Sequence, residues 1–309
     1  MLRIAFQMES LAEVTPAKNS SAHLMAEALR RKYRVFHYQP QQLMVKNGEV
    51  FAYAAEVKSL GAKKGSAKTG AYGWRNLGEM DIVLVRQDPP FNMEYTTSTY
   101  FLEQLPKRVR VLNNPHWIRN TPEKIAPLLF PEFIPPTLFT RDAEQLAAFY
   151  EEHRDIVIKP LYGHHGNGVF HLKPKDDSVA AIIEYALHTS TEPWIAQPYI
   201  PEVRKGNIRV LFLDGEVVGA FKVVPEAGEF RLYRGSMNQK HTLTKRERAM
   251  CEKVGPVLKE RGLYYVGIDI IGEYLIEINV TSTGSIDKFN ALYGKKMERM
   301  FWDGIEKCS

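Results

Sequence analysis

Residues 264–284, with the sequence YYVGIDIIGEYLIEINVTSTG, constrain the fold of this chain more than any other stretch. The two halves, 264–270 and 274–280, are rich in β-branched and aromatic residues, as strands are. The short connection between them contains Gly272, a residue typical of turns. We therefore expect a β-hairpin near the C-terminal end of the sequence, within an otherwise apolar sheet.

Polar side chains interrupt both strands of this hairpin. Because side chains alternate along a strand, Glu277 and Asn279 share one face, whereas Ile276 and Ile278 point the other way. Pairing across the turn brings Asp269 near the first two. Buried carboxylates repel each other unless a cation lies between them, and their oxygens suit Mg²⁺. The alternative is an ordinary hairpin whose acidic residues face solvent.

The composition is that of a globular protein. At 309 residues the chain can form two or three subdomains with a substantial core. Hydrophobic content of 44% and charged content of 25% are ordinary values. The net charge of +5 is a mild excess without a basic run that contains interleaved aromatic residues, so we expect no nucleic-acid partner. A small anionic substrate such as a nucleotide fits this charge.

The small number of cysteines and the lack of long apolar segments indicate the cellular compartment of the protein. Cys251 and Cys308 are the only cysteines, so neither a disulfide framework nor a cysteine metal site is expected. Residues 1–10 have the pattern of a short strand and lack the long apolar region of a signal peptide. No apolar run approaches membrane-spanning length. We expect a cytoplasmic protein with no membrane contact.

The first third of the chain has the pattern of an α/β domain. Residues 2–6 and 33–38 are candidate strands, and residues 20–31 form a candidate helix that begins at Ser20. A β-α-β opening of this kind predicts a parallel sheet with a right-handed crossover. Residues 43–53 follow with the pattern of a hairpin.

Two charged residues lie at the end of a further candidate strand in this domain, residues 81–86, and just beyond it. Arg86 ends that strand and Asp88 lies two residues beyond it. Ligands of open parallel sheets gather at the carboxyl ends of strands, so both residues are candidates for substrate contact. The alternative is that Arg86 and Asp88 only pair with each other.

A lysine and three glycines mark the second unit. The apolar strand 155–160 contains Lys159 and leads into a loop with Gly163, Gly166 and Gly168. Glycines let backbone N–H groups turn inward around phosphate oxygens, and an ammonium adds a point charge. The order differs from the P-loop, whose lysine follows its glycines. Ordinary hairpins also carry glycines, so this pattern alone is weak.

Three more expectations concern the second unit. Residues 121–124 begin a helix with Pro122 in its first turn. His164 and His165 lack a third metal ligand at useful spacing and are expected as surface or loop residues. Residues 194–201 form an extended segment that can link two lobes and bond an adenine edge through its backbone.

The third unit begins with a hairpin over residues 207–220, in which Arg209 points inward with strand periodicity. Residues 229–239 contain Arg231 and Arg234 and form a candidate lid over anionic groups; a solvated charge cluster is the alternative. Helices are predicted over residues 244–261 and 288–307.

Taken in order, these segments resemble the ATP-grasp ligases and, within them, the prokaryotic glutathione synthetase family. The resemblance covers almost the whole chain and depends on the order and spacing of several short motifs. These are Asn19-Ser20-Ser21, Arg86-Gln87-Asp88-Pro89-Pro90-Phe91 with Tyr100 beyond, Lys124, Ile134-Pro135-Pro136-Thr137, Lys159-Pro160-Leu161, Gln197-Pro198-Tyr199-Ile200-Pro201, Val266-Gly267-Ile268-Asp269-Ile270-Ile271-Gly272 and Glu277-Ile278-Asn279-Val280-Thr281-Ser282.

The resemblance implies an α/β protein whose ATP-grasp part is α+β. Residues 1–119 would form the N-terminal domain with a parallel sheet on the substrate side. Residues 120–200 would form the central subdomain with the glycine-rich loop, and residues 201–309 the C-terminal subdomain with the metal site. ATP would lie between the last two, and the protein would assemble as a homodimer or homotetramer.

The resemblance also implies roles for individual residues. Arg209 and Lys159 would be catalytic, and Mg²⁺, or Mn²⁺ in its place, would be held by Asp269, Glu277 and Asn279. The residues that would contact ATP are Lys124, Lys159, Gly163, Gly166, Gly168, Gln197, Tyr199, Ile200, Asn207 and Glu277. The residues that would face the peptide substrate and the reacting groups are Asn19, Ser20, Ser21, Arg86, Asp88, Arg231 and Arg234.

The implied reaction joins γ-glutamylcysteine and glycine. A carboxylate is a poor acylating agent, so ATP first converts it to an acyl phosphate, and the amine then displaces phosphate. Phosphoryl transfer needs charge neutralisation and positioning more than covalent help. A ligase for another acid and amine pair, and a catalytically silent ATP-binding protein, are the alternatives.

The chain departs from the family pattern at several positions. Tyr162 stands where the glycine-rich loop usually carries Asp, and Asn207 stands in place of another Asp. The family's Asn-Leu-Ala-Ala-Gly-Gly-Arg run is absent from the lid segment. Residues 283–287 replace Pro-Thr-Gly-Ile-Arg, which puts Asp287 where Arg is expected. The nucleotide half therefore follows the family more closely than the acceptor half.

Overall fold

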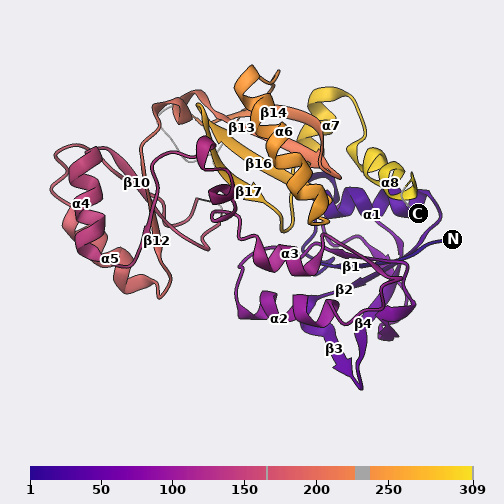
Figure 1. Ribbon diagram of the computed structural model, residues 1–309. Helices are drawn as coiled ribbons and strands as arrows, with labels where there is room; N and C mark the ends of the chain where they lie inside the picture. Colours follow the sequence, from indigo (N-terminus) through magenta and orange to yellow (C-terminus); the bar gives the residue numbers. More distant parts are fainter. Residues whose placement is uncertain (165, 227–236, 308–309) are drawn as a thin grey trace.

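The computed structural model describes residues 1–164, 166–226 and 237–307. Their strands form three sheets (Figure 1). In this view the N-terminal unit lies at the lower right, the central unit at the left, and the C-terminal unit above and between them. No helix in the described parts of the chain is both long enough and apolar enough to cross a membrane.

The N-terminal sheet has the predicted parallel centre and an antiparallel extension. The order is β3-β4-β2-β1-β7-β8; neighbours from β2 to β8 are parallel, and β4 runs antiparallel to β2 and also pairs with β5 and β6. The sheet is therefore mixed rather than purely parallel. The strands are β1 (Arg3–Gln7), β2 (Arg34–Tyr38), β3 (Leu43–Lys46), β4 (Glu49–Ser59), β5 (Lys68–Thr69), β6 (Gly73–Asn76), β7 (Ile82–Val85) and β8 (Arg110–Leu112).

Strand β1 is buried on both faces, as its apolar run requires. Ile4 and Phe6 pack in one cluster with Leu24 and Trp302, whereas Ala5 belongs to the cluster on the opposite face. The helices of this unit are α1 (Ser20–Arg30), α2 (Met93–Leu102) and α3 (Pro115–Asn120).

The central sheet is antiparallel and has the order β11-β10-β12-β9. Two helices, α4 (Ala143–His153) and α5 (Val179–Thr189), lie together at its outer side (Figure 1). The glycine-rich loop joins two antiparallel neighbours, as predicted. The strands are β9 (Leu138–Thr140), β10 (Ile156–Pro160), β11 (Phe170–Leu172) and β12 (Trp194–Pro198).

The helix predicted at residues 121–124 is wrong. This segment is a turn followed by the 3₁₀ helix η4 (Ala126–Leu129). The carbonyl of Glu123 accepts a hydrogen bond of 2.9 Å from the N–H of Ile278. The segment therefore binds to the C-terminal sheet, and this tertiary contact overrides the local helix signal.

The C-terminal sheet contains both predicted hairpins and has the order β15-β14-β13-β16-β17. The predicted helix 244–261 is α6 (Lys245–Glu260), which begins with a capping box of Thr244 and Glu247. The predicted helix 288–307 is instead two helices, because Gly294 ends the first at φ 63°. These are α7 (Ile286–Tyr293) and α8 (Met297–Lys307), and the strands are β13 (Asn207–Leu213), β14 (Glu216–Val224), β15 (Met237–Lys240), β16 (Tyr265–Ile271) and β17 (Tyr274–Asn279).

A β-bulge alters the alternation along β17. Asp269 pairs with Glu277 and Ile270 pairs with Leu275, so Ile276 is an extra residue on this strand. Leu275 packs in the core, whereas Ile276 and Glu277 both line the cavity described below. The expectation that Ile276 points away from Glu277 is therefore wrong, because a bulge breaks the period of two.

One asparagine joins the N-terminal and C-terminal sheets. The buried amide of Asn113 donates to the carbonyls of Tyr265 and Val280 at 3.0 and 2.8 Å, and its oxygen accepts from the N–H of Tyr265 at 2.9 Å. Three backbone groups of the C-terminal hairpin therefore depend on a single side chain just beyond β8.

An Asn113→Ala substitution should lower the thermal midpoint by about 5 °C or more, because each buried polar group left unpaired costs about 1–3 kcal/mol. The measurement is thermal unfolding followed by circular dichroism. The exposed Asn120 provides the matched control as Asn120→Ala. Equal midpoints for the two variants would contradict the proposed role of Asn113.

Candidate active site

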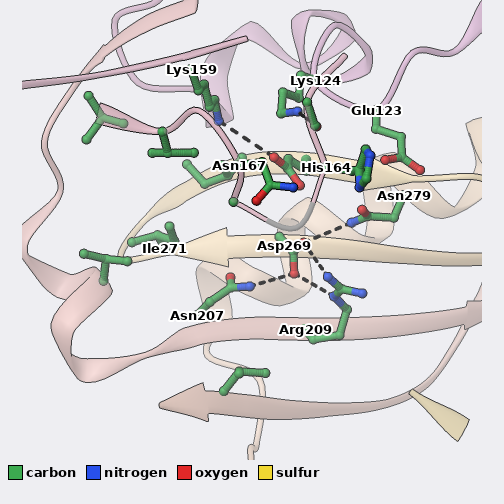
Figure 2. Close-up of a pocket in the computed structure, with 18 of the residues that line it drawn as sticks. Glu123, Lys124, Lys159, His164, Asn167, Asn207, Arg209, Asp269, Ile271 and Asn279 are labelled. Carbon is green, nitrogen blue, oxygen red and sulfur yellow. Dashed lines mark hydrogen bonds and ion pairs between the residues drawn. The ribbon is translucent and has the colours of Figure 1, made fainter. Parts of the chain in front are cut away.

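A cavity of about 360 Å³ lies between the central sheet and the C-terminal sheet. Figure 2 shows Lys124 and Lys159 on one side of it and Asp269 with its hydrogen-bond partners on the other. The lining comes from β10, the glycine-rich loop, the linker after β12, and the strands β13, β14, β16 and β17. The rest of the lining is formed by Pro89, Glu123, Lys124, the end of β12, residues 281–285 and Lys288.

Asp269 is the centre of the polar network in this cavity. Both of its oxygens bind Arg209, with Nε–Oδ1 and Nη2–Oδ2 distances of 2.6 and 2.7 Å. Asn207 donates to Oδ1 at 2.7 Å, and Asn279 donates to Oδ2 at 3.0 Å. Asp269 is only 6% exposed, so the prediction of a buried acidic hairpin holds and the solvent-facing alternative is wrong for this residue.

The predicted metal ligands share one face of the sheet. Asp269 and Glu277 are directly opposite each other on β16 and β17, and Asn279 bonds to Asp269. No group of three or more His, Cys, Asp or Glu among the described residues could hold a metal by itself. Two carboxylates and one amide nevertheless fit Mg²⁺ chemically, because Mg²⁺ usually completes its coordination with water and substrate phosphates.

The two lysines predicted to contact phosphate both line the cavity. The Nζ atom of Lys159 is 3.9 Å from an oxygen of Glu277. Burial lowers the pKa of Lys159 and the charge of Lys124 acts in the same direction, whereas Glu277 opposes them. Lys124 donates to the carbonyls of Leu161, at 3.3 Å, and of Gly163. It therefore anchors the glycine-rich loop.

Glu123 is a site residue that sequence reasoning missed. Its carboxylate accepts hydrogen bonds from the hydroxyl and the N–H of Thr281, at 2.7 and 3.3 Å. Burial raises the pKa of Glu123 and the negative charge of Glu277 adds to this, while the bonds from Thr281 lower it. The only available signal was its position next to Lys124 in the sequence, where a helix was expected.

Two of the three loop glycines line the cavity, and the third does not. Gly163 and Gly166 line the cavity, whereas Gly168 packs against Pro160. Gly166 and Gly168 have φ values of 69° and 72°, which favour glycine. His164 lies in the loop as expected, but it lines the cavity.

The linker residues predicted to hold adenine also line the cavity: these are Gln197, Tyr199 and Ile200. The side chain of Gln197 donates to the hydroxyl of Thr137 at 3.0 Å. The ring of Tyr199 stacks on His171 with centroids 3.9 Å apart. Asn207 is buried nearby, and its Oδ1 has no hydrogen-bond partner within the described residues.

Arg86 and Asp88 contact the segment that follows β17 rather than each other. The buried guanidinium of Arg86 donates to the hydroxyl of Ser21 at 3.0 Å and to the carbonyl of Thr283 at 2.7 Å. Asp88 accepts a hydrogen bond from Ser282. The alternative, in which Arg86 and Asp88 only pair with each other, is therefore wrong.

The residues predicted at 19–21 surround the start of α1. Asn19 caps this helix through the N–H of Ala22 at 2.8 Å and donates to Glu9 at 2.7 Å. The hydroxyl of Ser20 accepts a hydrogen bond of 3.1 Å from the N–H of Ile286. Two helix starts, those of α1 and α7, therefore meet here. Arg231, Arg234 and His165 lie outside the described residues.

Solved structures with the same fold are ATP-grasp enzymes. The ATP-grasp ligase PsnB, complexed with a phosphomimetic variant of its minimal precursor, Mg and ADP, has a TM-score of 0.64 at 18% identity, over 99% of this chain and 97% of that chain. D-alanyl-alanine synthetase A from Vibrio cholerae has a TM-score of 0.66 at 15% identity, with coverage of 99% and 97%. The fold is that of an ATP-grasp ligase.

Sequence comparisons identify the family. The family models for prokaryotic glutathione synthetase match residues 2–119 with the N-terminal domain and residues 123–294 with the ATP-grasp domain. The chain is 42% identical to the glutathione synthetase of Mesorhizobium japonicum and 40% identical to that of Brucella melitensis, each over 99% of this chain and 98% of the relative. The chain belongs to the prokaryotic glutathione synthetase family.

These similarities confirm the predicted α/β fold, the family and the ATP-dependent ligase activity. The division after residues 119 and 200, and the roles of individual site residues, remain predictions.

The raised pKa of Glu123 predicts a pH-dependent stability. The pKa lies above its ordinary value of 4.5, so the folded protein binds this proton more tightly than the unfolded chain does. The resulting stabilisation is full below pH 4.5 and is lost as the pH rises through the raised pKa. A Glu123→Gln variant lacks this titration, so the natural protein should lose thermal stability relative to the variant as the pH rises from 4.5 through the raised pKa.

The measurement is the thermal midpoint of both proteins across this pH range, without nucleotide or metal. The exposed Glu132 provides the control as Glu132→Gln, whose difference from the natural protein should stay constant. A constant difference for Glu123→Gln as well would contradict the assigned environment.

Proposed function

We propose that the protein joins γ-glutamylcysteine to glycine and converts ATP to ADP and phosphate, so that glutathione is the product. Two observations support this proposal. The chain resembles curated glutathione synthetases over its full length, and one cavity combines two lysines with a buried acidic network.

We propose that ATP binds in the cavity between the two ATP-grasp sheets. Lys124 and Lys159 would neutralise phosphate oxygens, and the glycines of the loop let the backbone approach them. The linker after β12 would hold adenine, and the unpaired Oδ1 of Asn207 would accept a ribose hydroxyl. This last contact explains how a neutral residue can serve where the family carries a carboxylate.

Asp269, Glu277 and Asn279 would hold Mg²⁺, or Mn²⁺ in its place, which supplies positive charge to phosphate oxygens when it is bound. Arg209 competes for the same carboxylate, since both oxygens of Asp269 accept hydrogen bonds from it. The two hydrogen bonds from Arg209 thus fix the orientation of the Asp269 carboxylate in the cavity.

The proposed chemistry proceeds in two displacements. A carboxylate oxygen of γ-glutamylcysteine attacks the terminal phosphorus of ATP, the bond to the bridging oxygen breaks, and ADP leaves. The amine of glycine then attacks the acyl carbon, the carbon–oxygen bond to phosphate breaks, and the nitrogen loses a proton. Lys159 and Arg209 would stabilise the negative charge that develops on phosphate and carbonyl oxygens.

We propose that the peptide acid lies at the junction of the N-terminal and C-terminal units. Asn19, Ser20, Ser21, Arg86 and Asp88 gather there against residues 282–286. Arg231 and Arg234 remain proposed substrate contacts. A different acid and amine pair is the second candidate, because residues 283–287 in this region depart from the family pattern.

ADP release should require both γ-glutamylcysteine and glycine, and omission of either should abolish it. A Glu277→Gln substitution should lower kcat/KM by about 100-fold or more, the effect of removing a group that stabilises transition-state charge. The exposed Glu273 on the same hairpin provides the control as Glu273→Gln. Coupled turnover with another acid and amine pair, and none with this one, would contradict the proposal.

We also propose a cytoplasmic homo-oligomer, either a dimer or a tetramer, in keeping with the family. The mass of the protein in solution, measured by light scattering after size-exclusion chromatography, should be a multiple of 35.4 kDa. A mass equal to that of one chain at micromolar concentration would contradict the oligomeric proposal.

A further inference from the structure

Lys288 lines the cavity from an element that contributes no other lining residue. It lies in the first turn of α7, after a segment, residues 281–285, that lines the same cavity throughout. The other two lysines of the cavity come from the central unit and face Glu277 and the glycine-rich loop. Lys288 is therefore the third lysine of a cavity that also contains Arg209.

The surroundings of Lys288 disfavour a positive charge. The side chain is half-buried, and burial together with the nearby charge of Arg209 lowers its pKa. The start of a helix is also positive, so a cation in the first turn is unfavourable. Asp287 and Asp269 oppose these effects. However, Lys288 has no hydrogen-bond or ion-pair partner among the residues that the structure describes.

A cation that lowers the stability of the ligand-free protein and faces a reaction cavity is a candidate for binding an anion. The neighbouring residue in the same turn is Asp287, so Lys288 is the cation available at this position. In the function proposed above, the phosphates already have Lys124 and Lys159, which come from the central unit. The anion at Lys288 is therefore a carboxylate of one of the two organic substrates.

The position of the carboxylate in each substrate indicates which of the two substrates Lys288 binds. An amino-acid acceptor carries its carboxylate on the carbon next to the attacking nitrogen, so that carboxylate must lie close to the reacting centre. The spare carboxylate of the peptide acid lies at the far end of the molecule, near Arg86 in the arrangement proposed above. A cation that lines the same cavity as Arg209 and Asp269 suits the acceptor.

We propose that Lys288 binds the α-carboxylate of the amino-acid acceptor and thereby makes the enzyme select an amino acid over a simple amine. This inference rests on the proposed function, in which the acceptor is glycine. Lys288 is a specificity residue in this assignment, since it contacts the acceptor without taking part in phosphoryl transfer.

The test is a Lys288→Met substitution, which keeps the length of the side chain and removes its charge. The KM for glycine should rise by about 10- to 100-fold, as expected for the loss of a charge-assisted hydrogen bond. The KM values for ATP and γ-glutamylcysteine should stay within about twofold of the natural protein. The thermal midpoint should be unchanged or higher, because an unfavourable charge has been removed, and Lys288→Arg should restore most of the affinity for glycine.

Glycinamide, which lacks the carboxylate, provides a second and independent measurement. The natural protein should prefer glycine to glycinamide, and Lys288→Met should reduce the ratio of the two kcat/KM values by about tenfold or more. Lys295 lies seven residues further along the chain and is exposed, so Lys295→Met is the matched control and should leave the ratio unchanged.

The outcomes separate this inference from the proposed function. If the natural protein releases no ADP with γ-glutamylcysteine and glycine, the proposed function fails and the inference fails with it. If the natural protein is active and Lys288→Met has an unchanged KM and an unchanged ratio, only the inference fails. A change in the KM for γ-glutamylcysteine or ATP instead, or a lower thermal midpoint, would likewise overturn it.

Discussion

The ion pair between Arg209 and Asp269 is the interaction on which the rest of the site depends. It joins the two central strands of the C-terminal sheet, where the two residues are directly paired in the register. A shift of one residue between these strands would move every side chain to the other face. It would bury an arginine in the apolar core and turn Ile268 or Ile270 toward the cavity. Charge pairing and hydrophobic burial therefore specify the same register.

The cavity combines two kinds of surface that come from different units. On the phosphate side, lysines of the central unit face acidic residues of β16 and β17. Residues 281–285 and Lys288 form another wall, and the N-terminal unit contacts this part of the chain through Arg86 and Ser20. The first wall therefore comes from the central and C-terminal units, whereas the second belongs to the C-terminal unit and is supported by the N-terminal unit.

Much of this arrangement follows from short-range patterns. The hairpin that places Asp269 opposite Glu277 was predictable because strand alternation and a glycine turn define it. The bulge at Ile276 was not, because no local signal specifies where an extra residue enters a strand. Glu123 was missed because its position depends on a backbone bond to Ile278, far away in the sequence. The break at Gly294 also went unrecognised, and Lys288 was therefore assigned to a long covering helix instead of a site.

The hydrogen bond from the N–H of Ile286 to Ser20 has a consequence for how this family can diversify. Through this bond the start of α1, near the N-terminal end of the chain, supports the first turn of α7. Chimeric enzymes that exchange residues 2–119 between relatives would transplant this support along with the domain. If Lys288 binds the acceptor as proposed, such chimeras would change the support of this residue without changing the residue itself.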